Sequence, residues 1–160
     1  MRYLLIDRIE RLQIDRQITA IKNVTLSEDV FSEHFIGNPV MPGALLIESL
    51  AQAGTALLEV SSEMRKKALL VMVMRAKFRS LVRPGDQLRI TVTLLSQDND
   101  MAETDCTIHV GDRLVADARL VFALRDVEQF YPDQIKNIVK VGYDFLLKDA
   151  QVIDETGGNE

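Results

Sequence analysis

The sequence has very few residues that could form a disulfide or hold a metal ion. Among its 160 residues are one cysteine, Cys106, two histidines and no tryptophan. A lone cysteine cannot form an internal disulfide, and one cysteine with two histidines supplies too few ligands for a structural zinc site. We therefore expect no disulfide, no metal and no other cofactor.

The sequence also lacks a long apolar segment and an excess of positive charge. It has no run of roughly eighteen uninterrupted apolar residues, and charges follow the N-terminus too closely for a signal peptide. The formal net charge of −5 leaves no global basic field for nucleic acid or an anionic membrane. We expect a cytoplasmic protein in which any acidic partner meets a local basic patch. The densest basic run is residues 65–67, although a solvated loop is the simpler interpretation of it.

The pattern of apolar residues predicts one α+β domain. Residues 44–60 predict the longest helix, apolar on most sides, and Pro42 and Gly43 suit its first turn. A narrow polar stripe follows one face of this helix and consists of Glu48, Gln52, Thr55 and Glu59. Such a helix is expected to be buried.

Alternating patterns predict an early strand and a later run of consecutive strands. The early strand is residues 17–24, and the later strands include residues 87–94, 105–110 and 114–122, with a hairpin turn at Gly111-Asp112. A helix followed by an antiparallel meander indicates an antiparallel sheet wrapped around one long central helix.

The C-terminal segment differs from the rest. We place the main domain at residues 1–125 and a C-terminal extension at residues 126–160. Helical spacing of apolar residues in the extension predicts a surface helix, interrupted by Gly142, and residues 156–160 resemble a frayed terminus.

Two residues suggest acid/base chemistry. A lone histidine such as His34 is most simply a loop or core residue, and Glu48 taken alone could merely begin the solvent-facing stripe. A carboxylate in a mostly apolar helix is nevertheless costly to bury, so we expect it to be paired or partly protonated. Together the two residues have the ingredients of a general acid and base.

The segment His34-Phe35-Ile36-Gly37-Asn38-Pro39-Val40-Met41-Pro42-Gly43, with Glu48 fourteen positions after His34, carries a resemblance to a known family. It closely resembles the β-hydroxyacyl-acyl-carrier-protein dehydratases of type II fatty acid synthesis. Residues 3–8, Lys77-Phe78-Arg79 and residues 83–88 resemble further family segments. The resemblance covers roughly residues 1 to 125.

This resemblance implies a hotdog fold, a homodimer with shared active sites and an acyl carrier protein as the partner that brings the substrate. Dimers of many relatives gather into trimers of dimers. It implies a lyase of fatty acid or related acyl-chain biosynthesis that converts (3R)-3-hydroxyacyl thioesters to trans-2-enoyl thioesters. His34 and Glu48 are the implied catalytic residues.

Four further residues are candidates for substrate binding or for positioning. The Gly43 backbone amide, at the positive end of the helix, is the candidate donor to the thioester oxygen. Gln52, one turn after Glu48, could orient that carboxyl group or simply bond to backbone. Phe35 and Met41 could line the acyl tunnel, although most apolar side chains at such spacing belong to the core.

The sequence departs from the plain dehydratase pattern at Ile36, where proline is usual. The Ile36-Gly37 form is similar to a branch that also isomerises the double bond, whereas Glu48 and the following residues favour the dehydratase-only branch. Two rivals are an acyl thioesterase on the same fold and a non-catalytic acyl-binding subunit. The presence of both His34 and Glu48 favours the dehydratase over either rival.

Overall fold

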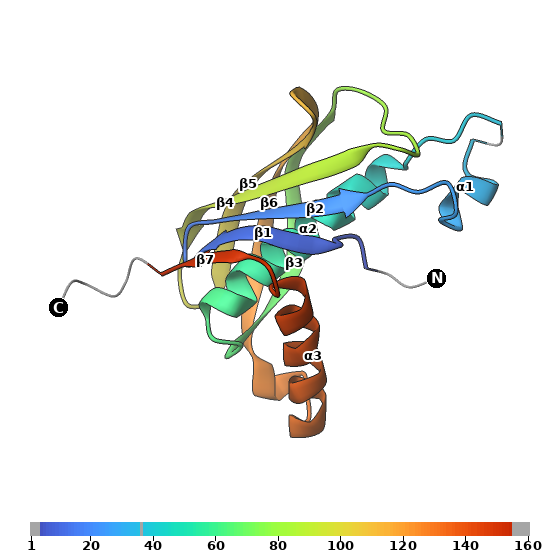
Figure 1. Cartoon of the computed structure of the whole chain (residues 1–160). Helices are drawn as coiled ribbons and strands as arrows, with labels where there is room; N and C mark the ends of the chain where they lie inside the picture. Colours follow the sequence, from blue (N-terminus) through green and yellow to red (C-terminus); the bar gives the residue numbers. More distant parts are fainter. Residues whose placement is uncertain (1–3, 36, 155–160) are drawn as a thin grey trace.

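The computed structural model describes residues 4–35 and 37–154, and within them the strands form one curved sheet (Figure 1). The strand order is β3-β6-β5-β4-β2-β1-β7. The strands are β1 (Arg8–Gln13), β2 (Gln17–Asn23), β3 (Lys66–Phe78), β4 (Gln87–Gln97), β5 (Met101–Val110), β6 (Arg113–Asp126) and β7 (Gln151–Ile153). The strands predicted from alternation are therefore confirmed.

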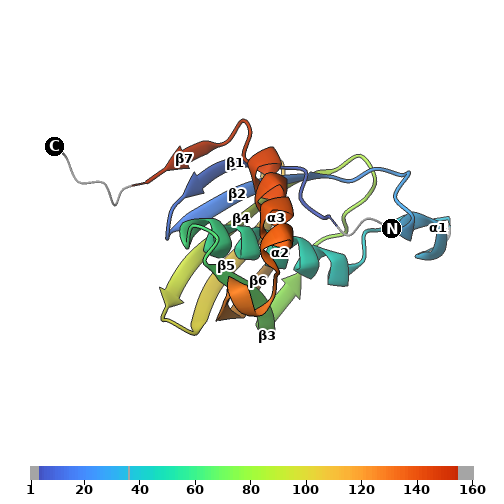
Figure 2. The ribbon, with the colours of Figure 1, turned by 90° about the horizontal axis from the view of Figure 1, so that it is seen from below.

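The predicted long helix is α2 (Gly43–Ser61), and the sheet curves around it. Its apolar side chains pack on β2, β3, β4, β5 and β6, so the core lies between the helix and the concave face of the sheet. Figure 2 shows α2 running beneath the strands. This arrangement confirms the hotdog fold, an antiparallel sheet wrapped around one long central helix.

The turn at Gly111-Asp112 joins β5 and β6 as predicted. Val110 pairs with Arg113, and Gly111 adopts a φ of 56°, in the left-handed region that favours glycine. The side chain of Cys106, on β5, is fully buried. Burial raises the pKa of its thiol to about 12, so Cys106 is a core residue with no thiolate to react.

One short α-helix and one short strand were not predicted. A short helix, α1 (Val30–Glu33), precedes the motif that begins at His34, and β7 adds to the sheet beside β1. Because β7 runs parallel to β1, the sheet is antiparallel except at this edge. At the N-terminus, the strand β1 begins at Arg8.

The predicted surface helix corresponds to α3 (Asp133–Leu146), which a single turn of 3-10 helix, η1 (Val127–Gln129), links to β6. Three features named from the sequence, Tyr3, Ile36 and the frayed terminus at residues 156–160, lie outside the described residues. By length and composition alone α2 could also cross a membrane. Because 61% of that apolar window is buried in the fold, α2 has the character of a core helix.

Close packing of α2 on β6 depends on Gly54. A Cβ atom at this position would lie 2.7 Å from Cζ of Phe122, whose side chain is fully buried. Ala at an exposed helical position is more stable than Gly by up to about 1 kcal/mol. At Gly54 this gain competes with overpacking, which typically costs about 1–3 kcal/mol.

We therefore predict that Gly54→Ala lowers the free energy of unfolding, measured by urea denaturation, by about 1–2 kcal/mol. Gly142→Ala is the matched control, because a Cβ there meets nothing within 4 Å. The control should raise the free energy of unfolding. An increase in the free energy of unfolding for Gly54→Ala would contradict the prediction and show that the ring of Phe122 can shift to accommodate the added Cβ.

Candidate active site

His34 directly follows α1, and its backbone amide donates to the Val30 carbonyl at 3.0 Å. The imidazole is half-buried, with Nδ1 3.2 Å from the Val40 carbonyl oxygen. A carbonyl oxygen can only accept, so this contact places the proton of the neutral ring on Nδ1. Nε2 then carries the free lone pair, as a general base requires.

The loop between His34 and α2 is fastened to the connection between β3 and β4. The Met41 amide donates to the Val82 carbonyl at 2.8 Å. The Arg83 guanidinium donates to Oδ1 of Asn38 at 2.6 Å and to the Pro39 carbonyl at 3.3 Å. Residues 83–88 were noted in the sequence only for their resemblance to the family, and here Arg83 holds the shape of the motif loop.

Glu48 and Gln52 lie one turn apart on α2 and are half-buried. Gln52 Nε2 donates to Oε1 of Glu48 at 3.0 Å, while Gln52 Oε1 accepts from the Leu5 amide at 2.8 Å. The second bond fixes which end of the Gln52 amide faces the carboxylate. The expected carboxyl–amide contact is therefore present, and the N-terminal segment determines its orientation.

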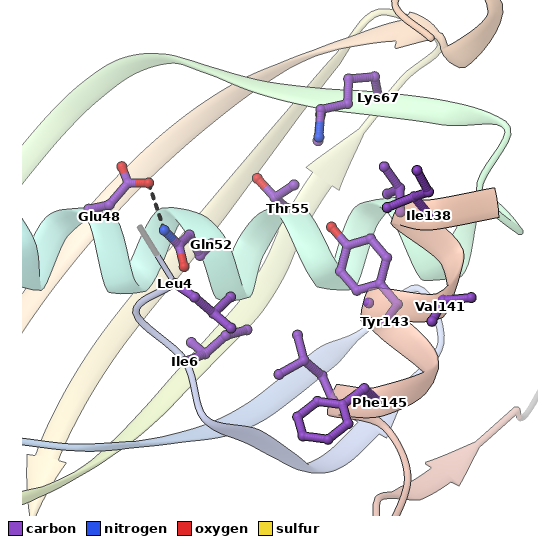
Figure 3. A pocket seen from close by; sticks show the side chains of 14 residues that line it. Leu4, Ile6, Glu48, Gln52, Thr55, Lys67, Ile138, Val141, Tyr143 and Phe145 are labelled. Atoms are coloured by element: carbon purple, nitrogen blue, oxygen red, sulfur yellow. Dashed lines mark hydrogen bonds between the residues drawn. The ribbon is translucent and has the colours of Figure 1, made fainter. Parts of the chain in front are cut away.

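Glu48 and Gln52 border a cavity of about 850 Å³ (Figure 3). The cavity lies between α2, β3, the N-terminal segment and α3. It is lined by Leu4, Ile6, Glu48, Gln52, Thr55, Lys67, Ala68, Ile138, Val139, Val141, Gly142, Tyr143, Phe145 and Leu146. His34 is not among the described residues that line it, so the wall of this cavity in one chain contains the acid of the candidate pair but not the base.

Gly43 is the first residue of α2, where backbone amides have no acceptor within the helix. The glycine allows a close contact, but with another part of the protein. A Cβ on Gly43 would lie 2.9 Å from Cζ of Phe78, at the end of β3. Phe78 was not predicted to belong to the site, and only the folded structure brings its ring to the start of α2.

The two apolar candidates have different environments. Phe35 is 60% exposed, adopts a φ of 54° and packs its ring edge-on against His34, with centroids 4.3 Å apart. Met41 is buried in the core cluster and does not border the cavity. Phe35 thus lies beside the histidine, whereas the structure places Met41 in the core.

The far end of the polar stripe has a separate function. Glu59 is 1% exposed, and its Oε1 accepts from Nζ of Lys67 at 2.6 Å and from the Ala68 amide at 3.2 Å. Its Oε2 accepts from the hydroxyl of Tyr143 at 2.9 Å, which connects α2 to α3. Burial, together with the charge of Glu59, raises the pKa of Tyr143, so this hydroxyl remains a donor.

The basic run at residues 65–67 is less available to a partner than the sequence suggested. Lys66 pairs with Asp126 at 2.8 Å, and Lys67 pairs with the buried Glu59. Arg65 donates through Nε to the Ser62 carbonyl at 3.1 Å. Two of the three charges are thus neutralised within the chain.

Known structures show which class of protein has this architecture. A dehydratase heterocomplex, ApeI:P from Xenorhabdus doucetiae, superposes with a TM-score of 0.62 at 17% identity, covering 87% of this chain and 90% of that one. A variant of the fluoroacetyl-CoA-specific thioesterase FlK also gives a TM-score of 0.62, at 14% identity, covering 82% and 98%. Both similarities establish the fold that surrounds the cavity and do not distinguish the two activities.

The sequence comparisons are more specific. Residues 1–119 match the family described as FabA-like domain. The 3-hydroxyacyl-acyl-carrier-protein dehydratase FabZ of Levilactobacillus brevis is 44% identical over 120 residues, which are 74% of this chain and 81% of that protein. The chain belongs to the FabZ dehydratases within the FabA-like family. Membership confirms the predicted dehydratase, a lyase of fatty acid biosynthesis.

The Tyr143–Glu59 contact provides a test of how α3 is held. Tyr143→Phe removes one of the three donors to a buried carboxylate, so we expect the free energy of unfolding to fall by about 1–3 kcal/mol. Thermal and urea denaturation measure this change. Tyr131→Phe is the matched control, because it removes a hydroxyl from the ring that lies 5.7 Å from Lys67 Nζ and leaves the contacts of Glu59 intact. Equal effects of the two variants would contradict this role for Tyr143.

Proposed function

We propose that this protein dehydrates (3R)-3-hydroxyacyl-acyl-carrier-protein to trans-2-enoyl-acyl-carrier-protein. The observation that carries the proposal is that a FabZ-family chain retains both His34 and Glu48, with Glu48 bordering a cavity and bonded to Gln52. The acyl carrier protein is the substrate-bearing partner, as in the name of the relative. The proposed setting is the cytoplasm.

The proposed reaction uses one base and one acid. Nε2 of His34 removes a proton from C2 of the substrate, and the electrons of that C–H bond form the C2–C3 double bond. The C3–O bond breaks as Glu48, protonated at the start, gives its proton to the departing hydroxyl, which leaves as water. Proton exchange with solvent then restores neutral His34 and protonated Glu48.

The thioester oxygen gains negative charge as the C2 proton leaves. The Gly43 amide is the proposed donor, because it lies at the N-terminal end of α2, where amides lack intrahelical acceptors and the helix dipole is positive. Gln52 is the proposed positioning residue for Glu48, supported by its bonds to both Glu48 and the Leu5 amide.

We further propose that the pair is completed across a dimer, with His34 of one subunit facing Glu48 of the partner subunit. The cavity that Glu48 borders supports this arrangement, since His34 of the same chain is not among its described lining residues. Phe35, 60% exposed beside His34, fits a position covered by a second subunit.

The edge strand β3 is the proposed dimer contact. Among the described strands β3 pairs only with β6, so one side of its backbone is open. The side chains of residues 70–79 are all exposed, on both faces of the strand, and they include the apolar residues Leu70, Val71, Met72, Val73 and Met74. A long, exposed, apolar edge strand is a strong site for strand pairing. Pairing of two β3 strands would join the two sheets into one. Analytical ultracentrifugation of the wild-type protein distinguishes a dimer from a trimer of dimers.

Mixed dimers test the shared site. His34→Ala and Glu48→Ala should each lower kcat/KM by roughly a hundredfold or more, because each removes a general acid or base. Unfolded together in equal amounts and refolded, they form heterodimers in which one of the two sites is intact. Activity should return to about a quarter of the wild-type value, as expected for random pairing in a two-fold dimer.

The readout is the enoyl product, followed by absorbance and mass. Full activity in either single variant would overturn the mechanism, and no recovery on mixing would place both residues within one chain. Free acid as the product would instead indicate a thioesterase. A 3-enoyl product would show that the enzyme also isomerises the double bond, as the resemblance of Ile36-Gly37 to the isomerising branch suggests.

Charges on the β3 edge test the dimer. We expect the double variant Met72→Lys, Val73→Lys to sediment as a monomer in analytical ultracentrifugation and to lose activity, because lysines on both faces of an edge strand oppose pairing. Leu95→Lys on β4 is the control, since Leu95 is also an exposed apolar residue, at 47%, but lies on an interior strand. A double variant that remains dimeric would place the contact elsewhere.

A further inference from the structure

The C-terminal helix α3 forms one wall of the cavity that begins at Glu48. Figure 3 shows Ile138, Val141 and Phe145 on α3 across the cavity from Glu48 and Gln52 on α2. These three side chains are 66%, 65% and 68% exposed, an unusual degree of exposure for large apolar residues of one helix. The match to the FabA-like family ends at residue 119, so this wall lies beyond the matched segment.

The exposed apolar residues of α3 lie on one face with Gly142 among them. Residues 138, 141, 142 and 145 have the i, i+3, i+4, i+7 spacing of a single helical stripe. Gly142 borders the cavity, and a Cβ added there would meet nothing within 4 Å. The stripe therefore has a gap, or notch, at Gly142, whereas its other three members each contribute an apolar side chain.

The wall is held in place from two sides. Tyr143 bonds to the buried Glu59, and Leu146 is itself part of the core cluster. After α3 the chain returns to the sheet, where β7 pairs with β1 and the Ile14 amide donates to the Ile153 carbonyl at 3.0 Å. Such anchoring at both its core-facing side and its C-terminal end makes α3 a fixed surface beside the cavity.

We infer that α3 limits the length of the acyl chain that the enzyme accepts, with the chain lying along the stripe of Ile138, Val141, Gly142 and Phe145. The inference rests on the proposed function, because it places the reacting end of the substrate at Glu48. An aliphatic chain fits the observations because the groove is continuous with Glu48, and its volume of about 850 Å³ is in the range of small-molecule sites. At the far end of the cavity, the Tyr143 hydroxyl and the Lys67 ammonium are already bonded to Glu59. An apolar chain placed there therefore displaces neither of these two bonds.

The test measures kcat/KM for a series of 3-hydroxyacyl-acyl-carrier-protein substrates, from 3-hydroxybutyryl to 3-hydroxypalmitoyl. Gly142→Leu fills the notch, and we expect it to lower kcat/KM for the longest accepted chains by about tenfold or more, as pocket methylenes typically do. The kcat/KM for the 3-hydroxybutyryl substrate should fall much less than that for the longest accepted chains. Phe145→Ala opens the wall and should shift the preference toward longer chains.

Lys140→Leu is the matched control, because Lys140 is an exposed residue of α3 that does not border the cavity. It should leave the chain-length profile as in the wild type, and urea denaturation of all variants checks that α3 is retained. The inference would be overturned if the wild-type enzyme dehydrates these substrates and both Gly142→Leu and Phe145→Ala show the same chain-length profile as the wild type. That result would leave the proposed function intact.

A wild-type enzyme that dehydrates none of the substrates would overturn the proposed function itself. Sedimentation of the same variants tests whether the cavity is instead occupied by a second copy of the chain. A change in oligomeric state on Phe145→Ala or Gly142→Leu, without a change in chain-length profile, would assign the stripe to a subunit contact and overturn its role toward the acyl chain.

Discussion

Burial of α2 beneath the curved sheet is the constraint on which the rest of the structure depends. An almost wholly apolar helix fills the concave face, and the few carboxylates it carries must each be accommodated. Glu59 is enclosed and receives three donors, from Lys67, Ala68 and Tyr143, which makes it a structural junction. Glu48 has Gln52 as a donor and borders a cavity, so it keeps a side open for chemistry. One helix therefore supplies both a structural and a reactive carboxylate.

The proposed base is held by different means. His34 lies outside the core helix, on a loop whose shape depends on the Arg83–Asn38 and Met41–Val82 contacts. The Val40 carbonyl then selects the ring tautomer. An acid on a rigid helix and a base on a buttressed loop can be brought together by a neighbouring subunit without deforming either element. This separation is consistent with a site completed by association along β3.

Local patterns in the sequence predicted the elements whose burial is periodic. Residues 44–60 and the alternating strands were found because one side of each faces the core, and the spacing of His34 and Glu48 identified the family. The contacts that hold the site could not be predicted in this way. Phe78 over Gly43, Arg83 with Asn38 and Tyr143 with Glu59 each join residues far apart in sequence, and β7 is too short to show alternation.

The extension after β6 shows how such a fold can gain selectivity without altering its chemistry. The residues proposed to react lie on α2 and its preceding loop, within the segment that matches the family, whereas α3 and β7 follow that segment. The helix α3 is anchored by the bond between Tyr143 and Glu59, and β7 is anchored by pairing with β1. Because of these anchors, α3 adds a wall to the cavity without displacing Glu48 or Gln52. Changes on the cavity face of α3 can thus alter the space available to an acyl chain while the acid, its amide partner and the sheet remain as they are.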